Sequence, residues 1–528
     1  MKALRLILSS LLAIAGVVVP FWLMHHGINY QDEPYQMLNA LEWAETPVAP
    51  LSALAGWLWS KAFGFTLLAF RSFAVICTLL SVALAAAVLY RRTHRLDYAL
   101  AAFGAGALAL AWVPSKCYLY GWDSLSILLV TAVMVAIAAY MRRPSWIRAC
   151  GLGFLAALAT LSRLPDAAVM LPALAAIIVS GNARKRLTVC IGTYAIVLIF
   201  CICAIYGTPG AYFTSLSENM ISGHDLAYIM QGYQRTLSAT LHFTLLAGGI
   251  VMFFRILSSL GAFVIACIVL LSGLVFPPYP LATVANFLSL GCLLAFSAYC
   301  TVSGKKQSNI LVAVVLVTAF CATVGSDMGF EKVITVQAVI LLIAEAPDRV
   351  RRSLMLAAAT MFVIVLRVEV PRQRERTFED KGYGYTATQV TVSPFRGVYT
   401  TKLKAFEAEY LQSVTDEWQK QGGEVVVLGD CFHYAVDLIA GHKRPDKLRH
   451  YYLIDNPGYF AEAAKLIPEA TGGNVMVITS RPFDWRYSGI EATDHFPALR
   501  RYRATYTPCF TIYTPAGATP PQPPADEQ

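Results

Sequence analysis

Long apolar runs separated by short basic clusters dominate this chain and constrain its fold more than any other feature. Hydrophobic residues make up 57% of its 528 positions and charged residues only 14%, whereas soluble domains average about 45–50% and 25%. A soluble globule cannot hide that much apolar surface, so much of the chain must be surrounded by membrane lipids. The sequence therefore predicts a polytopic α-helical membrane protein with about 13 spanning helices.

The basic clusters all fall on one side of the membrane when the apolar runs are threaded in order. The first seven helices are expected near 6–24, 66–90, 97–113, 124–140, 149–163, 166–180 and 187–206, and helix 13 near 353–370, with helices 8 to 12 between them. The clusters on the shared side include Arg91–Arg92, Arg142–Arg143, Arg184–Arg186, Lys305–Lys306 and Arg349–Arg352. The positive-inside rule then predicts a cytoplasmic N-terminus in the cell (inner) membrane.

The first apolar run is expected to remain in the protein, since no small-residue cleavage pattern precedes His25. With 13 helices, the chain after helix 13 emerges on the extracytoplasmic side. We therefore divide the sequence into a membrane domain, 1–370, with an outer loop at 25–64, an extracytoplasmic domain, 371–514, and a disordered Pro-rich tail, 515–528.

The extracytoplasmic domain is predicted to be a small α/β unit. Apolar segments at 424–429 and 474–479 are typical of short buried strands, and helical stretches are expected at about 399–420 and 457–467. Ten of the 12 cysteines lie in or beside apolar stretches, where Cys packs as a small hydrophobe. The other two, Cys431 and Cys509, could form a disulfide outside the cytoplasm.

Several function classes are excluded by composition and motif content. The net charge of +9 lies in the short clusters between apolar runs, which is a topology signal and not a nucleic-acid-binding face. Gly151 and Gly153 are spaced as in a dinucleotide site, but they lie inside an apolar helix with no preceding strand. The sequence has no P-loop. An outward-facing site without nucleotide chemistry points to an activated lipid donor.

The sharpest candidate for chemistry is the carboxylate pair Asp32-Glu33 just beyond helix 1. An Asp at this place could act as a general base that deprotonates an acceptor hydroxyl while a sugar is transferred to it. The alternative is structural: Asp32, two residues before Pro34, could be the N-cap of an outer helix. On spacing alone the cap is the simpler interpretation.

Other polar residues gather in the turns on the same side. The cations that suit a donor phosphate are Lys116, Arg163, Arg235 and Lys332. The residues that suit contact with a sugar or acceptor are Tyr35, Tyr118, Tyr120, Asp123, His224 and Asp225. Taken singly, each is more typical of an interfacial anchor or a snorkelling side chain, and Asp123 could cap helix 4.

The order of these motifs resembles a known superfamily. The matching segments are Asp32–Tyr35 (DEPY), Pro47–Leu51 (PVAPL), Phe63–Gly64, Ala69–Ser72 (AFRS) and the hairpin Gly153–Pro165. They are similar to motifs of the GT-C superfamily of polyprenyl-phosphate-sugar-dependent glycosyltransferases, in its family-39, ArnT-like and protein O-mannosyltransferase-like branch. The run Gly121–Ser126 (GWDSLS) is also similar to uncharacterised members from Bacteroidetes-type bacteria.

The resemblance covers residues 1 to about 240, and it implies the activity and the site. The activity would be inverting transfer of a sugar from a polyprenyl phosphate to a lipid, glycan or protein acceptor. Asp32 matches the catalytic base, Glu33 would be a supporting carboxylate, and Arg163 matches the basic residue of the hairpin motif. Metal use varies within the superfamily, so a divalent metal stays open, and the sequence offers no compelling ligand set.

Three other functions remain open at this point. A flippase for a lipid-linked intermediate would typically show repeated halves and ionisable residues near the membrane midplane, whereas here they gather at one face. A polymerase or ligase of lipid-linked oligosaccharides would favour a larger central outer loop than 207–238. A non-catalytic envelope-assembly protein would use its C-terminal domain to bind a partner. The cluster Asp430-Cys431-Phe432-His433 is better interpreted as a strand-end turn than as a second site.

Overall fold

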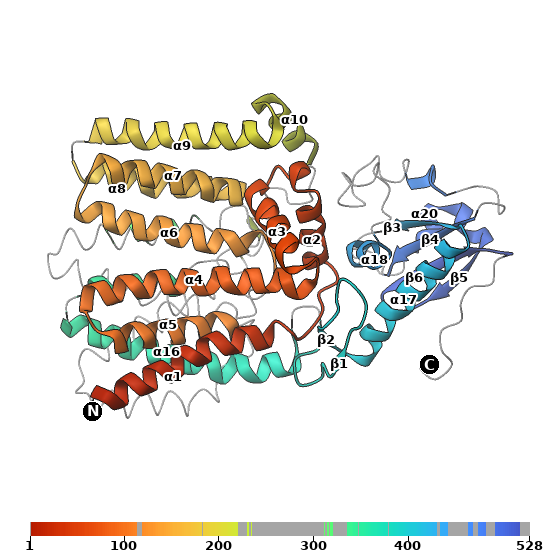
Figure 1. The fold of residues 1–528 in the computed structure, drawn as a ribbon, viewed down its shortest axis with the longest axis horizontal. Coiled ribbons are helices and arrows are strands. Elements are labelled where there is room, and N and C mark those ends of the chain that lie inside the picture. Colours follow the sequence, from red (N-terminus) through yellow and green to blue (C-terminus); the bar gives the residue numbers. More distant parts are fainter. Residues whose placement is uncertain are drawn as a thin grey trace.

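The structure is a computed structural model in which a helical bundle and a small mixed sheet lie at opposite ends of the molecule (Figure 1). It describes residues 2–112, 119–181, 183–219, 335–346, 348–377, 380–429, 433–441, 463–467, 474–481 and 491–517, together with single positions between 230 and 321.

Four helices among the described residues are long and apolar enough to cross a membrane: α1 (Lys2–Leu23), α4 (Leu67–Thr93), α6 (Trp122–Arg142) and α9 (Ala183–Tyr206). Shorter or more polar helices pack beside them: α5 (Leu96–Trp112), α7 (Trp146–Ser162), η2 (Leu164–Val169), α8 (Met170–Val179), α10 (Pro209–Asn219), α15 (Thr335–Glu345) and α16 (Asp348–Glu375). The chain is thus a predominantly helical membrane protein over the part that the structure describes.

The expected helices 1 to 7 and 13 coincide with described helices within a few residues, except that expected helix 6 is divided into η2 and α8. Pro165 stands at the start of η2, where a missing N–H costs nothing. In the region expected to hold helices 8 to 12, the structure describes only α15 and single positions, so the total of 13 stays a prediction.

Glycines allow the backbones of α1 and α5 to approach closely. A Cβ on Gly16 would lie 2.9 Å from the Cα of Gly104, and a Cβ on Gly104 would overlap the backbone of Leu12. Small residues at helix crossings are the usual way for membrane helices to gain packing contacts, because lipid gives no hydrophobic force between them. This contact fixes the middle of α1, and the candidate site follows the C-terminal end of that helix.

Two short helices, α2 (Asp32–Leu41) and α3 (Pro50–Phe63), lie across the end of the bundle between the spanning helices and the sheet (Figure 1). The turn between them is η1 (Trp43–Glu45). The α2 helix is amphipathic and buries Met37 and Leu38, while α3 leaves Leu58 and Phe63 more than half exposed. Such helices are typical of a membrane surface.

The C-terminal residues contain the elements β1 (Thr388–Gln389), β2 (Tyr399–Thr400), α17 (Lys402–Lys420), β3 (Glu424–Leu428), α18 (His433–Ile439), β4 (Val475–Ser480), α20 (Ala492–His495), η5 (Pro497–Arg501), β5 (Tyr502–Tyr506) and β6 (Phe510–Pro515). The larger sheet has the order β3-β4-β6-β5, in which only β3 and β4 are parallel. Nearly every side chain of β3 and β4 is buried, and their sequences are therefore mostly apolar without alternation.

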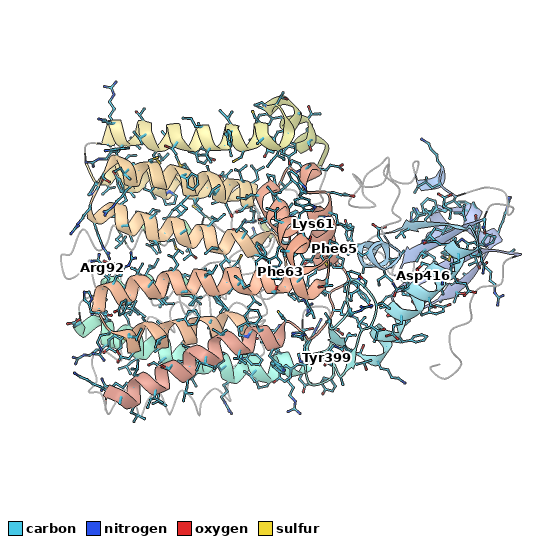
Figure 2. All side chains as sticks on the ribbon, viewed as in Figure 1. Lys61, Phe63, Phe65, Arg92, Tyr399 and Asp416 are labelled. Atoms are coloured by element: carbon cyan, nitrogen blue, oxygen red, sulfur yellow. The ribbon has the colours of Figure 1, made fainter. Side chains whose placement is uncertain are left out.

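Basic residues gather at the end of the bundle opposite the sheet. Figure 2 shows Arg92 there, whereas Tyr399 lies beside the C-terminal elements. Glu345 at the end of α15 forms ion pairs with Arg92 (3.3 Å) and with Arg142. The predicted cytoplasmic clusters after α4 and α6 therefore share one end of the bundle, as the positive-inside rule requires.

Replacing Gly104 with Ala should lower stability, because the added methyl group has no space against the backbone of α1. We expect a loss of about 1–3 kcal/mol, typical of overpacking, measured as a lower melting temperature in detergent. Gly151→Ala is the matched control, since a Cβ there meets nothing within 4 Å. Equal melting temperatures for both variants would contradict the close crossing of α1 and α5.

Candidate functional site

A buried ion pair organises the outer loop after α1. Arg71, in the second turn of α4, donates from Nε to Glu33 Oε1 (2.8 Å) and from Nη2 to Glu33 Oε2 (2.6 Å). The same guanidinium donates to the carbonyls of Met24 (2.7 Å) and Gly27 (2.8 Å). Both side chains are 1% exposed. Two parallel charge-assisted hydrogen bonds fix the pair in a single geometry.

Glu33 therefore holds the loop in place through its contacts with neighbouring helices. Its Oε1 also accepts a hydrogen bond from the backbone N–H of Tyr120 (3.2 Å), which ties the start of α6 to the loop. A carboxylate that is 0% exposed and bound on both oxygens has no free face for substrate. Glu33 thus holds the loop through Arg71, and the supporting role expected for it in the reaction stays a prediction.

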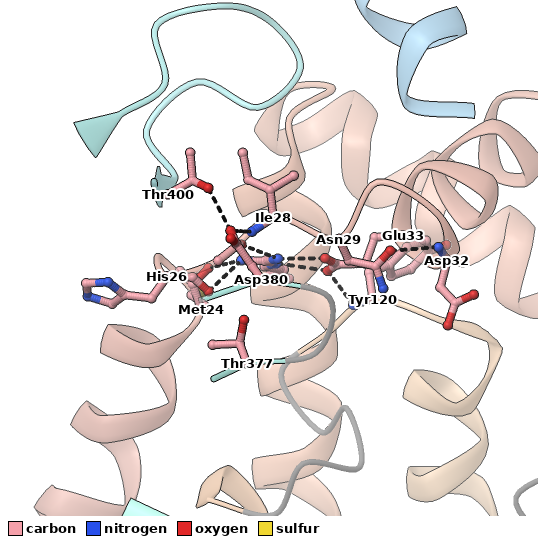
Figure 3. Close-up of polar contacts among 12 residues, drawn as sticks. Met24, His26, Ile28, Asn29, Asp32, Glu33, Tyr120, Thr377, Asp380 and Thr400 are labelled. Carbon is pink, nitrogen blue, oxygen red and sulfur yellow. Dashed lines mark hydrogen bonds and ion pairs between the residues drawn. The ribbon is translucent and has the colours of Figure 1, made fainter. Parts of the chain in front are cut away.

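Asp32 is the first residue of α2, and its side chain does not cap the helix. The N-cap position is Gln31, and the carboxamide of Asn29 accepts from the N–H groups of Gln31 (2.7 Å) and Asp32 (2.8 Å). Asn29 thus performs the capping that the spacing suggested for Asp32. The Asp32 side chain is only partly buried, and its carboxylate points away from the side chain of Asp380 (Figure 3). An acid in the first turn is also stabilised by the helix dipole.

Arg163 and its neighbours form a second polar cluster at the same end of the bundle. Arg163 caps the C-terminus of α7 and pairs with Asp166 (Nη1 to Oδ1, 2.9 Å) and Asp123 (Nε to Oδ1, 3.6 Å). Asp166 also accepts a hydrogen bond from Ser126 and is fully buried, whereas the Asp123 side chain is 49% exposed. The N-cap of α6 is Gly121, so Asp123 pairs with Arg163 and does not cap that helix.

The structure describes two of the aromatic residues predicted to contact a sugar or acceptor, Tyr35 and Tyr120, and they differ in exposure. Tyr35 on α2 is partly exposed and lies between Trp122 (5.8 Å between ring centroids) and Tyr434 of α18 (5.0 Å). Tyr120 is only 4% exposed and packs on Phe70. Its ring fills the space beside Gly56, and the assignment of Tyr120 to sugar or acceptor binding stays a prediction.

The remaining predicted site residues lie outside the described part of the chain: Lys116, Tyr118, His224, Asp225, Arg235 and Lys332. Their roles stay predictions. Cys509 is a free thiol whose pKa is raised chiefly by burial, and its proposed disulfide partner Cys431 is also outside the described residues.

The described residues include no group of three or more His, Cys, Asp and Glu side chains that could hold a metal ion. Glu33 and Asp380 are both engaged by cations or backbone N–H groups.

Three residues of this site were not among the sequence-based candidates. Arg71 lies in an apolar span, where an ionisable residue requires a partner. That requirement could have identified Arg71 from the sequence. Asn29 carried no signal beyond its place three residues before Asp32. Asp166 follows Arg163 in the hairpin turn, but only the fold shows that it is fully buried beneath that arginine.

No protein-family model and no curated protein matches this chain. Among solved structures, it is similar to the crystal structure of ArnT from Cupriavidus metallidurans bound to undecaprenyl phosphate. The identity is 12% and the TM-score 0.47, over 97% of this chain and 99% of that chain. At this level of similarity the residues themselves must carry the functional argument.

Arg71→Met should destabilise the protein strongly, because it leaves the Glu33 carboxylate buried without a partner. The expected loss is about 3–5 kcal/mol, seen as a lower melting temperature and a smaller yield of monodisperse protein in detergent. Arg500→Met is the control, since Arg500 is mostly exposed and its pair with Asp494 spans 3.9 Å. A variant at Arg71 as stable as the control would show that the buried pair does not organise the loop.

Proposed function

We propose that this protein is an integral membrane glycosyltransferase that transfers a sugar from a polyprenyl-phosphate-linked donor to a lipid, glycan or protein acceptor on the extracytoplasmic side. The observation that carries this proposal is the placement of Asp32. Asp32 is the first residue of α2, on a loop held by a buried ion pair, and α2 lies at the end of the bundle opposite Arg92 (Figures 1 and 2).

In this proposal Asp32 acts as the general base. Its carboxylate takes the proton of an acceptor hydroxyl as that oxygen bonds to the anomeric carbon of the donor sugar. The bond between the anomeric carbon and the phosphate oxygen breaks, and polyprenyl phosphate leaves with the electron pair. The buried Glu33–Arg71 pair keeps the reacting carboxylate in place, since small displacements of a catalytic group are costly.

The candidate for the donor phosphate is Arg163. Its guanidinium is anchored by the fully buried Asp166, while its second partner, Asp123, is half exposed. The Arg163 side chain is 5% exposed, and a guanidinium matches the bidentate geometry of a phosphate. The proposed base and the proposed phosphate ligand both belong to the outer end of the bundle, where an activated lipid head group would lie.

A flippase is the main competing function, and the distribution of charge argues against it. Transport pathways place ionisable residues near the membrane midplane. In the described part of this chain, the ion pairs with both side chains buried are Arg71–Glu33 and Arg163–Asp166, and both lie at the outer ends of helices.

Asp32→Asn should abolish sugar transfer while leaving the fold intact, because the amide keeps the shape of the side chain but cannot accept the proton. Loss of a general base lowers kcat by about 100- to 10,000-fold. The measurement is mass spectrometry of envelope glycolipids, glycans and glycoproteins from a deletion strain complemented with each variant. Glu45→Gln is the control, an exposed carboxylate of the same outer loop.

Full restoration of the product by Asp32→Asn would show that Asp32 is not the base. Accumulation of a complete lipid-linked product, with no sugar missing, would instead support the flippase or ligase.

Arg163→Lys should weaken donor binding and leave the fold intact, because lysine keeps the charge opposite Asp166 but cannot form the bidentate contact of a guanidinium. We expect the KM for the lipid-linked donor to rise about 10-fold, the effect of one lost charge-assisted hydrogen bond, with a smaller change in kcat. Arg148→Lys, at the opposite end of α7, is the control. An unchanged donor KM would remove Arg163 from the phosphate site.

A further inference from the structure

A segment far from Asp32 in the sequence covers the loop that carries it. Residues 380–404, here called the strap, connect α16 to α17 and lie against residues 25–30. Two backbone hydrogen bonds join them as in a sheet, from Gly27 N to the Tyr399 carbonyl (2.8 Å) and from Tyr399 N to the His25 carbonyl (2.7 Å). The strap thus pairs with the loop along its backbone.

Side chains of the loop reinforce this pairing. The His26 ring stacks on Tyr399 (5.6 Å between centroids) and shares a hydrogen bond between its Nδ1 and Thr386 Oγ1 (2.9 Å). Burial is the main cause that lowers the pKa of His26 below its ordinary value. The Tyr30 hydroxyl donates to the carbonyl of Lys404 (3.0 Å).

Two charged residues of the strap form hydrogen bonds with the backbone of one loop residue, Ile28. Asp380 Oδ2 accepts from the N–H of Ile28 (2.8 Å), and Lys404 Nζ donates to the carbonyl of Ile28 (3.1 Å). Asp380 and Lys404 are themselves 3.6 Å apart as an ion pair, and Thr400 donates to the same Asp380 oxygen (2.6 Å). Figure 3 shows Asp380 and Thr400 beside Ile28. Both polar backbone groups of Ile28, which is 0% exposed, are thereby satisfied by the strap.

The contacts that hold Ile28 also affect the position of Asp32, because Asn29 connects the two. Ile28 is followed by Asn29, which is 1% exposed and whose carboxamide binds the N–H groups of Gln31 and Asp32. A shift of Ile28 would move Asn29 and hence the first turn of α2. Buried hydrogen bonds to charged groups hold more firmly than neutral ones, so this chain of contacts transmits position.

From these contacts we infer that Asp380 and Lys404 are positioning residues for the transfer reaction: they hold the Ile28 backbone so that Asn29 can set the place of the Asp32 carboxylate. This inference rests on the proposed function of Asp32. It assigns the C-terminal part of the chain the role of positioning the loop that carries Asp32. This role does not require that part to contact the acceptor.

The test uses the full-length protein with Asp380→Asn and Lys404→Met, each compared with Glu409→Gln. Glu409 is partly buried and accepts a solvent-exposed hydrogen bond from Thr391 of the strap (2.6 Å), so it is a matched control. Hydrogen exchange of the peptide spanning residues 25–34 reports on the loop without requiring activity. Transfer kinetics with the lipid-linked donor report on the reaction.

The expected result is faster exchange of residues 25–34 in both strap variants and a kcat lower by about 10- to 100-fold, with the donor KM changed by less than about 3-fold. Glu409→Gln should match the wild type in both measurements. In an Asp32→Asn background, Asp380→Asn should cause no more than about a 2-fold further loss, because both changes act through the same carboxylate.

Three outcomes would overturn the inference: unchanged exchange of the loop, a rise in donor KM at unchanged kcat, or a full multiplicative loss in the Asp32→Asn background. A wild-type protein that transfers no sugar would overturn the proposed function and, with it, the catalytic share assigned to the strap. The exchange measurement would then decide independently whether Asp380 and Lys404 hold the loop.

Discussion

The outer half of this protein depends on one buried guanidinium. A charge removed from water must be paired and hydrogen-bonded, or the fold loses several kcal/mol. Arg71 meets that requirement through the Glu33 carboxylate and the carbonyls of Met24 and Gly27, which belong to the segment between the end of α1 and the start of α2. The cost of leaving those groups unpaired forces the outer loop into one conformation on the end of the bundle.

The loop that carries Asp32 is held from two sides with different chemistry. On the bundle side it is held by Arg71, and on the other side by the strap, through the Asp380–Lys404 pair on Ile28. Arg71 contacts the backbone up to Gly27 and the Glu33 side chain in the first turn of α2, and the strap holds Ile28 between them. An irregular loop held in this way can position a reacting group as firmly as a regular element does.

Hydropathy was sufficient to locate the four long apolar helices α1, α4, α6 and α9 because lipid requires about 20 apolar residues for each crossing. It also placed the segments that form β3 and β4, since buried strands are continuously apolar. It could not assign roles to polar residues. Tyr120 fills the space beside Gly56, and the capping expected of Asp32 belongs to Asn29. Such roles depend on neighbours that are distant in the sequence.

The sequence by itself determined that this chain enters a membrane, which end of the bundle carries the basic clusters, and which carboxylate pair follows the first helix. Those features are local, because each depends on runs of apolar residues or on adjacent charges. Only the tertiary structure decided that Glu33 is paired with Arg71, that Arg163 is anchored by Asp166, and that residues 380–404 lie on the loop of Asp32. The physical reason is that a buried polar group is defined by its partner, and in this protein the partners come from helices and loops up to several hundred residues apart.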